Sequence, residues 1–155
     1  MVEVPFDPFM PWVFMGEEIL LSSRAFSHGY HIFSPTINVL AHIYVRRNKP
    51  KFWETVGRAF KRPGFHNRLN KVVIRRVKHL LGYPECDDDL LTPASLSVDK
   101  ERYGMGTYRT LMQYMDMVGL DPVAKTNRRL DWCYKGETPP ELLRYEAEEA
   151  MMSKV

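Results

Sequence analysis

In four parts of the chain, the arrangement of apolar and polar residues is typical of a helix. The expected helices span residues 16–29, 65–81, 107–118 and 140–152. A glycine lies at or just beyond the end of each of the first three, as is common where helices stop. The last is expected to begin at a Thr138 cap and carries mostly acidic residues. The third is expected to bury an apolar stripe made of Tyr108, Leu111, Met112, Met115 and Val118.

Residues 39–46 have a different pattern. Every second residue is apolar and would lie on one face of a strand, and the residues between them would form a more polar face. This period of two predicts a β-strand, with His42 on the polar face. A sheet of one or two strands is hardly stable by itself, so the strand is expected to belong to a larger sheet. A nucleotide-binding fold would need a strand, a glycine-rich turn and a helix in succession, and the sequence contains no such succession. The predicted fold class is α/β, mainly helical in this chain, with one or two strands and about four helices.

Length and composition suit one domain with a packed core. The chain has 155 residues, of which 45% are hydrophobic and 12% aromatic. Its longest apolar runs, residues 9–15 and 39–45, are shorter than the roughly 18 residues that a membrane helix needs. The N-terminus lacks the basic start and apolar middle of a secretion signal. Cys86 and Cys133 could form one disulfide, but a cytoplasmic location and reduced thiols are expected.

Positive charge is concentrated in one part of the chain. Residues 46–78 hold twelve basic residues and one acid, so this stretch carries +11 and the remainder −8, which gives the net charge of +3. Such a stretch predicts a basic surface, and its simplest interpretation is a solvated face. Binding to single-stranded nucleic acid is an alternative, with Phe52, Trp53, Phe60 and Phe65 as stacking groups. No nucleic-acid-binding motif supports that alternative.

Two adjacent carboxylates, Glu17 and Glu18, open the first expected helix. Acids at this position stabilise a helix because they interact with its positive N-terminal end. Both should therefore stay ionised, which suits electrostatic stabilisation or hydrogen bonding better than proton donation. The residues alone leave two roles open, a helix-stabilising pair or a pair of catalytic groups.

Several short motifs in a fixed order resemble a known enzyme family. They are "GEE" at a helix start, "SSRAFSHGY", "FSPT", "VLAHIYVRR", "KPKFWE" and, much later, "YGMGTYRTLMQYMDMVGLD". Together they resemble the GlcNAc-type glycosyltransferase family over most of residues 4–122. The known activity of that family adds N-acetylglucosamine to a hydroxyproline of a ubiquitin-ligase adaptor. The resemblance implies part of a GT-A-like glycosyltransferase fold, a nucleotide sugar similar to UDP-GlcNAc as donor, and a protein as acceptor.

A more distant similarity, to the mucin-type polypeptide GalNAc transferases, implies roles for single residues. Those enzymes have Gly-Glu-Asn before a helix with Ser and Arg at the offsets of Ser22 and Arg24, and their glutamate helps to hold the sugar. The similarity gives this role to Glu17, whereas Glu18 replaces the asparagine. A histidine on their following strand ligates the catalytic manganese, and His42 matches it. The site implied here has Glu17 and Glu18 as catalytic residues, His42 as the Mn²⁺ ligand, and substrate-binding positions at Gly16, Arg24, Tyr44 and Arg46.

The chemistry of sugar transfer fits these residue types. A nucleotide diphosphate leaves with negative charge, which a divalent cation and basic side chains stabilise. Manganese accepts carboxylate and imidazole ligands. A carboxylate beside the sugar can hold hydroxyl groups or offset positive charge on the anomeric carbon.

The chain lacks the upstream strands and the Asp-x-Asp or Asp-x-His motif that the family resemblance implies. Asp87, Asp88 and Asp89 follow the "GEE" segment and are interpreted as a solvated turn. The chain is therefore expected to be a C-terminal portion, with residues 1–60 as acceptor-side part and 61–155 as helical extension. It would transfer N-acetylglucosamine to hydroxyproline, Ser or Thr when complete and be inactive alone. The alternative is a non-enzymatic protein-interaction domain.

Overall fold

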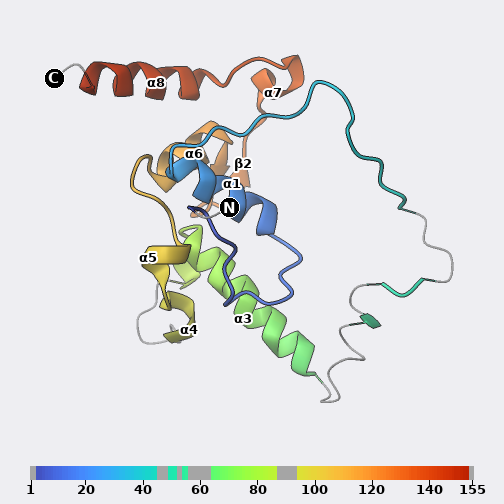
Figure 1. The fold of residues 1–155 in the computed structure, drawn as a ribbon. Helices are drawn as coiled ribbons and strands as arrows, with labels where there is room; N and C mark the ends of the chain where they lie inside the picture. Colours follow the sequence, from blue (N-terminus) through green and yellow to red (C-terminus); the bar gives the residue numbers. More distant parts are fainter. Residues whose placement is uncertain (1–2, 45–48, 52–53, 56–63, 87–93, 154–155) are drawn as a thin grey trace.

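The computed structural model describes residues 3–44, 49–51, 54–55, 64–86 and 94–153 (Figure 1). Helices dominate this part of the chain, and two short strands pair antiparallel with Leu120 opposite Asn127. The elements are α1 (Glu17–Ser27), α3 (Phe65–Leu80), the 3-10 helix η1 (Pro84–Cys86), α4 (Ala94–Ser97), α5 (Lys100–Tyr103), α6 (Leu111–Met117), β1 (Leu120–Asp121), β2 (Thr126–Asn127), α7 (Asp131–Lys135) and α8 (Pro140–Met152).

The four helices expected from the sequence are confirmed as α1, α3, α6 and α8. Among the described residues these are the helices of seven residues or more. Gly29, Gly82 and Gly119 have φ values of +93°, +74° and +67°, so each follows its helix in the left-handed region that glycine adopts without strain. The mainly helical character of the chain is thus confirmed, whereas the GT-A-like architecture stays a prediction.

The predicted start of the third helix was wrong by a full turn. Thr110 and Gln113 form a capping box, in which the threonine oxygen accepts from the Gln113 amide at 3.1 Å, so the helix begins at Leu111. Tyr108 lies outside the helix and is exposed, and Met112 is 69% exposed. Tyr114 takes the buried position in their place. The Thr138 cap was also wrong, because Pro139 is the N-cap of α8 and makes no side-chain cap bond.

The predicted strand over residues 39–46 was wrong for its described part. Residues 39–44 are not in a strand, and no described residue pairs with their backbone. Alternation favours a strand only where another strand supplies hydrogen bonds. Val45 and Arg46 lie outside the described residues, as do Asp87, Asp88 and Asp89.

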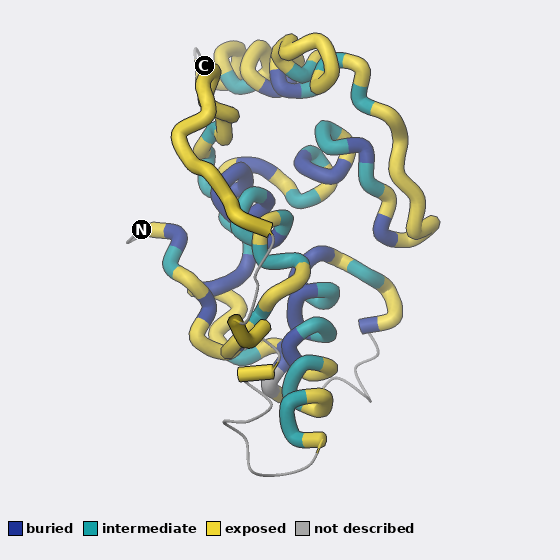
Figure 2. Tube along the Cα trace, turned by 90° about the vertical axis from the view of Figure 1, so that its right-hand side faces the viewer, coloured by how far each residue is buried: buried dark blue, intermediate teal, exposed yellow. Residues whose placement is uncertain are grey.

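The core extends from α3 through α1 and α6 to α8, and Figure 2 shows the buried positions in dark blue. α1 contacts both α3 and α6, and α6 contacts α8. Each helix contributes an apolar stripe, as its sequence spacing requires. The best-buried members of this core are Leu20, Phe26, Val73, Val77, Leu80, Met115 and Tyr145.

A buried ion pair fastens the N-terminal segment to α3. Arg76 Nε lies 2.7 Å from Asp7 Oδ2, and the two side chains are 1% and 0% exposed. The same guanidinium donates to the carbonyl oxygens of Leu96 and Val98. Because a buried charge is tolerated only when it is paired and hydrogen-bonded, these contacts fix three separate parts of the chain relative to one another.

Both cysteines are free thiols, Cys86 buried and Cys133 exposed, as the sequence led us to expect. No described helix has the length and apolar character that a membrane crossing requires.

Candidate functional site

The N-terminus of α1 places one of its two acids in a partly closed environment. Gly16 precedes the helix with φ +87°, and Glu17 and Glu18 occupy the first turn. Glu18 is exposed, whereas Glu17 is half-buried. Glu17 Oε2 is enclosed and has no hydrogen-bond partner among the described residues. Because this oxygen is enclosed, a ligand could bond to it only after a movement of the side chain or of its surroundings, but no bond within the described residues would have to break.

Gly16 is required by close packing as well as by its backbone conformation. A Cβ atom at this position would lie 2.9 Å from Val77 Cγ1 of α3. No side chain can be placed there unless α1 or α3 shifts. The glycine therefore allows the start of α1, with Glu17, to rest directly on α3.

Arg24 is held inside the protein by backbone carbonyl groups. Its side chain is almost completely buried, its Nη1 donates to Pro5 O at 2.7 Å, and its Nε donates to Gly104 O at 3.2 Å. Burial lowers the pKa of Arg24 from its usual value, and the charge of Asp7 opposes this shift. Its contacts connect the N-terminal segment with the loop before α6, so the described structure gives Arg24 a structural role.

A cavity of about 600 Å³ lies beside α1, within the size range of small-molecule sites. The segment of residues 30–36 forms one wall, α6 forms another, and α7 with the start of α8 closes it. Most of its lining is apolar or aromatic. Residues that line it include Ser22, Phe26, Phe33, Tyr114, Trp132 and Leu142.

A hydrogen-bonded pair of hydroxyl groups lies in the wall of this cavity. Ser22 Oγ and Tyr114 Oη are 2.6 Å apart and join α1 to α6. Burial raises the pKa of Tyr114 from its usual value, although its hydrogen bond with Ser22 opposes the shift. The phenol therefore stays protonated at neutral pH and can act as a hydrogen-bond donor.

Arg109 connects the edge of the cavity to α8. Its side chain is nearly buried and makes two bonds to Glu149, with Nε 2.7 Å from Oε1 and Nη2 3.1 Å from Oε2. The same Nη2 lies 3.2 Å from Nε2 of His31, which lines the cavity. The guanidinium also lies over the Phe26 ring, 4.9 Å from its centroid. The Arg109 hydrogen bond is the main cause that lowers the pKa of the Glu149 carboxyl.

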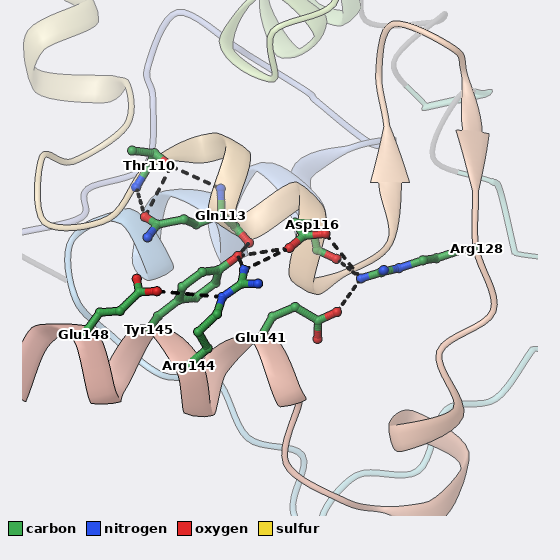
Figure 3. Close-up of polar contacts among 8 residues, drawn as sticks. All are labelled: Thr110, Gln113, Asp116, Arg128, Glu141, Arg144, Tyr145 and Glu148. Carbon is green, nitrogen blue, oxygen red and sulfur yellow. Dashed lines mark hydrogen bonds and ion pairs between the residues drawn. The ribbon is translucent and has the colours of Figure 1, made fainter.

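A second polar network attaches α8 to α6 (Figure 3). Asp116 Oδ2 accepts from Tyr145 Oη at 3.2 Å and from Arg144 Nη2 at 3.3 Å. Arg128, which follows β2, pairs with Glu141 at 2.6 Å. These contacts hold the residues beyond β2 against the helix that lines the cavity, so α8 is a fixed part of this site.

The described residues that the sequence expects to form one site lie in two separate parts of the structure, the start of α1 and the segment that holds His42 and Tyr44. His42 and Tyr44 are exposed, and the close contact between their rings, with centroids 4.2 Å apart, is within their own segment. Figure 1 shows residues 39–44 in an extended segment that runs away from the helices. Neither Glu17, Glu18 nor His42 lines the cavity. Arg46 lies outside the described residues.

The described residues do not form a manganese site by themselves. Among them, no group of three or more His, Cys, Asp or Glu side chains converges in a way that could hold a metal ion. His42 in its exposed segment is a single imidazole, and one such ligand does not bind a divalent ion stably.

Comparison with known families assigns the chain to an enzyme class. The family described as Glycosyltransferase (GlcNAc) matches residues 1–124, which include α1, the segment of residues 30–36 and α6. The chain belongs to this glycosyltransferase family. The match ends before α7 and α8, so the walls of the cavity come partly from the family region and partly from residues beyond it. No curated protein and no solved structure matches the chain.

Sequence reasoning missed the residues that form the cavity. Tyr114 was left out of the apolar stripe of its helix, and Arg109 was not singled out, although it lies between the aromatic Tyr108 and a helix start. The Thr110 and Gln113 capping box was a readable signal for where that helix begins. A helix that begins after this capping box has Tyr114 on its buried face and leaves Tyr108 outside. No local signal predicts that residues of α7 and α8 close the cavity.

Proposed function

We propose that this glycosyltransferase-family chain provides the acceptor side of an enzyme that transfers N-acetylglucosamine from a nucleotide sugar to a protein hydroxyl group. The family match over residues 1–124 is the observation that carries the proposal. The acceptor hydroxyl belongs to hydroxyproline, serine or threonine, and the donor resembles UDP-GlcNAc. Two features of the structure support it, the carboxylate of Glu17 and the cavity beside α1.

Glu17 is proposed to interact with the sugar. Its Oε2 has no hydrogen-bond partner among the described residues, so after a rotation of the side chain it can accept a bond from a sugar hydroxyl group. Its negative charge can also stabilise the positive charge that develops at the anomeric carbon. Glu18 is exposed and lacks this enclosure, so we assign it a smaller role.

The cavity is proposed to receive the acceptor protein. Its apolar and aromatic lining suits the side chains next to the modified residue, and the Ser22 and Tyr114 hydroxyl groups can orient a peptide through hydrogen bonds. Because α7 and α8 lie beyond the family match, this half of the wall can differ from one member to another. Such an arrangement suits recognition of a particular acceptor.

The donor side is proposed to come from protein outside these residues. The sequence contains no strand, glycine-rich turn and helix succession, and the described sheet has two strands of two residues each. The exposed segment of residues 37–44 would pair with that additional sheet. We propose His42 on this segment as one ligand of a manganese ion whose other ligands lie elsewhere, together with substrate contacts from Gly16, Tyr44 and Arg46. Arg24 is buried against backbone carbonyl groups, so we assign it a structural role.

The test compares the 155-residue chain with a longer protein that includes the donor-binding strands. Transfer of radiolabelled N-acetylglucosamine from UDP-GlcNAc to peptides containing hydroxyproline, serine or threonine is measured for both. We expect little or no transfer by the short chain. In the longer protein, Glu17→Gln should reduce transfer by roughly a hundredfold or more, since it removes charge but keeps shape. Glu18→Gln is the matched control, and His42→Ala should raise the manganese concentration needed for activity.

Three results would contradict the proposal. They are robust transfer by the short chain, equal losses for the two glutamate variants, and an unchanged manganese dependence of the His42 variant. The first would contradict the separate donor side, the second the role of Glu17, and the third that of His42.

A second candidate function is a protein-interaction domain without enzymatic activity. It is favoured by the row of large exposed apolar side chains, including Ile32, Phe33, Ile37, Leu40 and Ile43. An unpaired extended segment with such a row can add as a strand to another sheet. Tight binding of a partner by the longer protein with no transfer to any of the three acceptor residues would favour this function over the first.

A further inference from the structure

The packing of α3 fixes which of its faces points outward. The residues that it buries are Val73, Arg76, Val77 and Leu80. Arg76 Nε lies 2.7 Å from Asp7 Oδ2, and this ion pair prevents rotation of the helix about its axis. In Figure 1 the N-terminal half of α3 projects beyond the other helices, and Figure 2 shows its buried positions concentrated in the other half. On the opposite face, Arg68 and Lys71 are exposed.

Four basic side chains form a stripe along that outward face. They are spaced by three, four and three residues and are Arg68, Lys71, Arg75 and Lys78. At about 100° per residue, this spacing keeps all four within a quarter turn, roughly opposite the buried side. The stripe is about 15 Å long, from the rise of 1.5 Å per residue. Arg68 and Lys71 are exposed, and no described carboxylate forms an ion pair with either.

This stripe is unfavourable for the helix that carries it. α3 contains no acidic residue, so each basic side chain has a like charge three or four positions away. Arg68 lies near the positive end of the helix dipole, where a cation is disfavoured. Lys78 is relieved by Glu85 at 3.2 Å, but this contact lies at the far end of the helix. Within the described residues, the charges of Arg68 and Lys71 gain no ion pair that would offset this repulsion, which suggests that these two side chains serve a partner.

We propose that the outward face of α3 binds an acidic helical segment of another protein. A helix with carboxylates spaced by three, four and three residues presents them at the same intervals as the basic stripe, so the exposed Arg68 and Lys71 can each meet one anion. Single-stranded nucleic acid fits less well, because the stripe contains no exposed aromatic side chain for bases to stack on. This docking surface goes beyond the proposed transfer reaction and does not depend on it.

The binding test uses a defined acidic peptide. A fluorescein-labelled alanine-based helix with glutamates at the spacing three, four and three is titrated with the protein, and fluorescence anisotropy is measured at low and high salt. The control peptide has the same composition with its glutamates distributed around the helix. We expect tighter binding of the patterned peptide and weaker binding at high salt. Equal binding of the two peptides would overturn the proposal.

Charge-reversal variants locate the interaction on α3. Arg68→Glu with Lys71→Glu should weaken binding of the patterned peptide about tenfold, because two exposed ion pairs become repulsive. Arg129→Glu with Lys135→Glu changes the net charge equally at exposed positions on and beside α7 and should leave binding nearly unchanged. The first pair should not lower the thermal stability, since it removes like-charge repulsion within α3.

Two further results decide between partner classes. Equal losses in the two double variants would show unspecific attraction and contradict a specific surface. Tighter binding of a single-stranded oligonucleotide, or of vesicles containing phosphatidylserine, than of the patterned peptide would assign α3 to another class of partner and overturn the proposal as stated.

Discussion

α1 and the segment of residues 30–44 are neighbours in the sequence but lie in opposite environments. Leu20 and Phe26 of α1 are 2% and 3% exposed, whereas Phe33 and Leu40 of the segment are 81% and 90% exposed. Both regions fall within the family match. The difference therefore does not reflect apolar content, which is high in both, but whether other elements cover the apolar side chains.

The polar groups of the two regions show the same contrast. In α1 the buried side chains of Ser23, Arg24 and Ser27 all donate to backbone carbonyl oxygens. Residues 32–44 make no backbone hydrogen bond with any other described residue. Backbone groups in a packed protein are almost always paired. The second region therefore has the properties of a segment that can pair with the edge strand of another sheet. Stability should thus depend strongly on the first region and weakly on the second.

The largest effect is expected where a buried charge loses its partner. Asp7→Ala removes the carboxylate 2.7 Å from Arg76 and leaves that guanidinium buried at 1% exposure. We expect a loss of about 3 to 5 kcal/mol in the free energy of unfolding. Urea denaturation followed by circular dichroism measures it. Glu85→Ala, which removes a half-exposed partner of Lys78, is the control and should cost less than about 1 kcal/mol. Similar losses for both would contradict the role given to burial.

A matched pair of leucines tests the contrast directly. Leu20→Ala should lower the free energy of unfolding by about 3 kcal/mol, because it leaves a cavity between α1 and the core. Leu40→Ala removes the same atoms from a side chain that is 90% exposed, and its effect should stay within about 0.5 kcal/mol. The same urea denaturation measures both variants. A large loss for Leu40→Ala would show that residues 30–44 are packed in solution.

The sequence predicted the packed region well, because its signals are local. Apolar spacing together with Gly29, Gly82 and Gly119 set the extents of the helices to within a few residues, and the capping box at Thr110 was readable. The strand over residues 39–46 could not be decided in this way, since alternation states which face would be buried but not which partner would bury it. The sequence of this segment thus indicates which face would be buried but not which element would cover it.

Buried charges escaped the sequence reasoning for a similar reason. The resemblance implies a substrate contact for Arg24, and the charge pattern predicts a solvated basic face that includes Arg76, because arginine is usually exposed. Their burial depends on carbonyl groups of Pro5, Gly104 and Leu96, which lie far away in the sequence. For the candidate site, Glu17 was found by resemblance, whereas the cavity needs α7 and α8 and could be seen only in the fold.

A smaller effect is expected at the entrance to the packed region. Gly16→Ala places a Cβ 2.9 Å from Val77 Cγ1 at φ +87° and should cost about 2 to 3 kcal/mol from strain and overlap. Gly136→Ala has a similar φ of +68° but meets no atom within 4 Å, so it should cost about 1 kcal/mol. Thermal denaturation compares the two. Equal losses would mean that the contact between α1 and α3 is looser than the structure shows.

The smallest effect concerns the boundary between the two regions, where α8 is attached near His31. Glu149→Gln removes the ion pair with Arg109, whose distance is 2.7 Å, and should cost about 1 kcal/mol at neutral pH. The folded state lowers the pKa of Glu149 from its ordinary value, chiefly through the Arg109 hydrogen bond. The ionised carboxylate therefore stabilises the fold above about pH 4.5, and this contribution is lost as the pH falls through the lowered pKa.

The difference in unfolding free energy between the parent and Glu149→Gln should therefore be largest at about pH 7 and should shrink towards about pH 2, as the Glu149 carboxylate becomes protonated. Urea denaturation at the two pH values measures this difference. Glu148→Gln is the control, because its side chain is 58% exposed and lies 4.0 Å from Arg144, so it should differ little from the parent at either pH. A Glu149 difference that persists unchanged in acid would show that the side chain stabilises α8 by its shape and not by its charge, and the boundary would then be held by apolar packing alone.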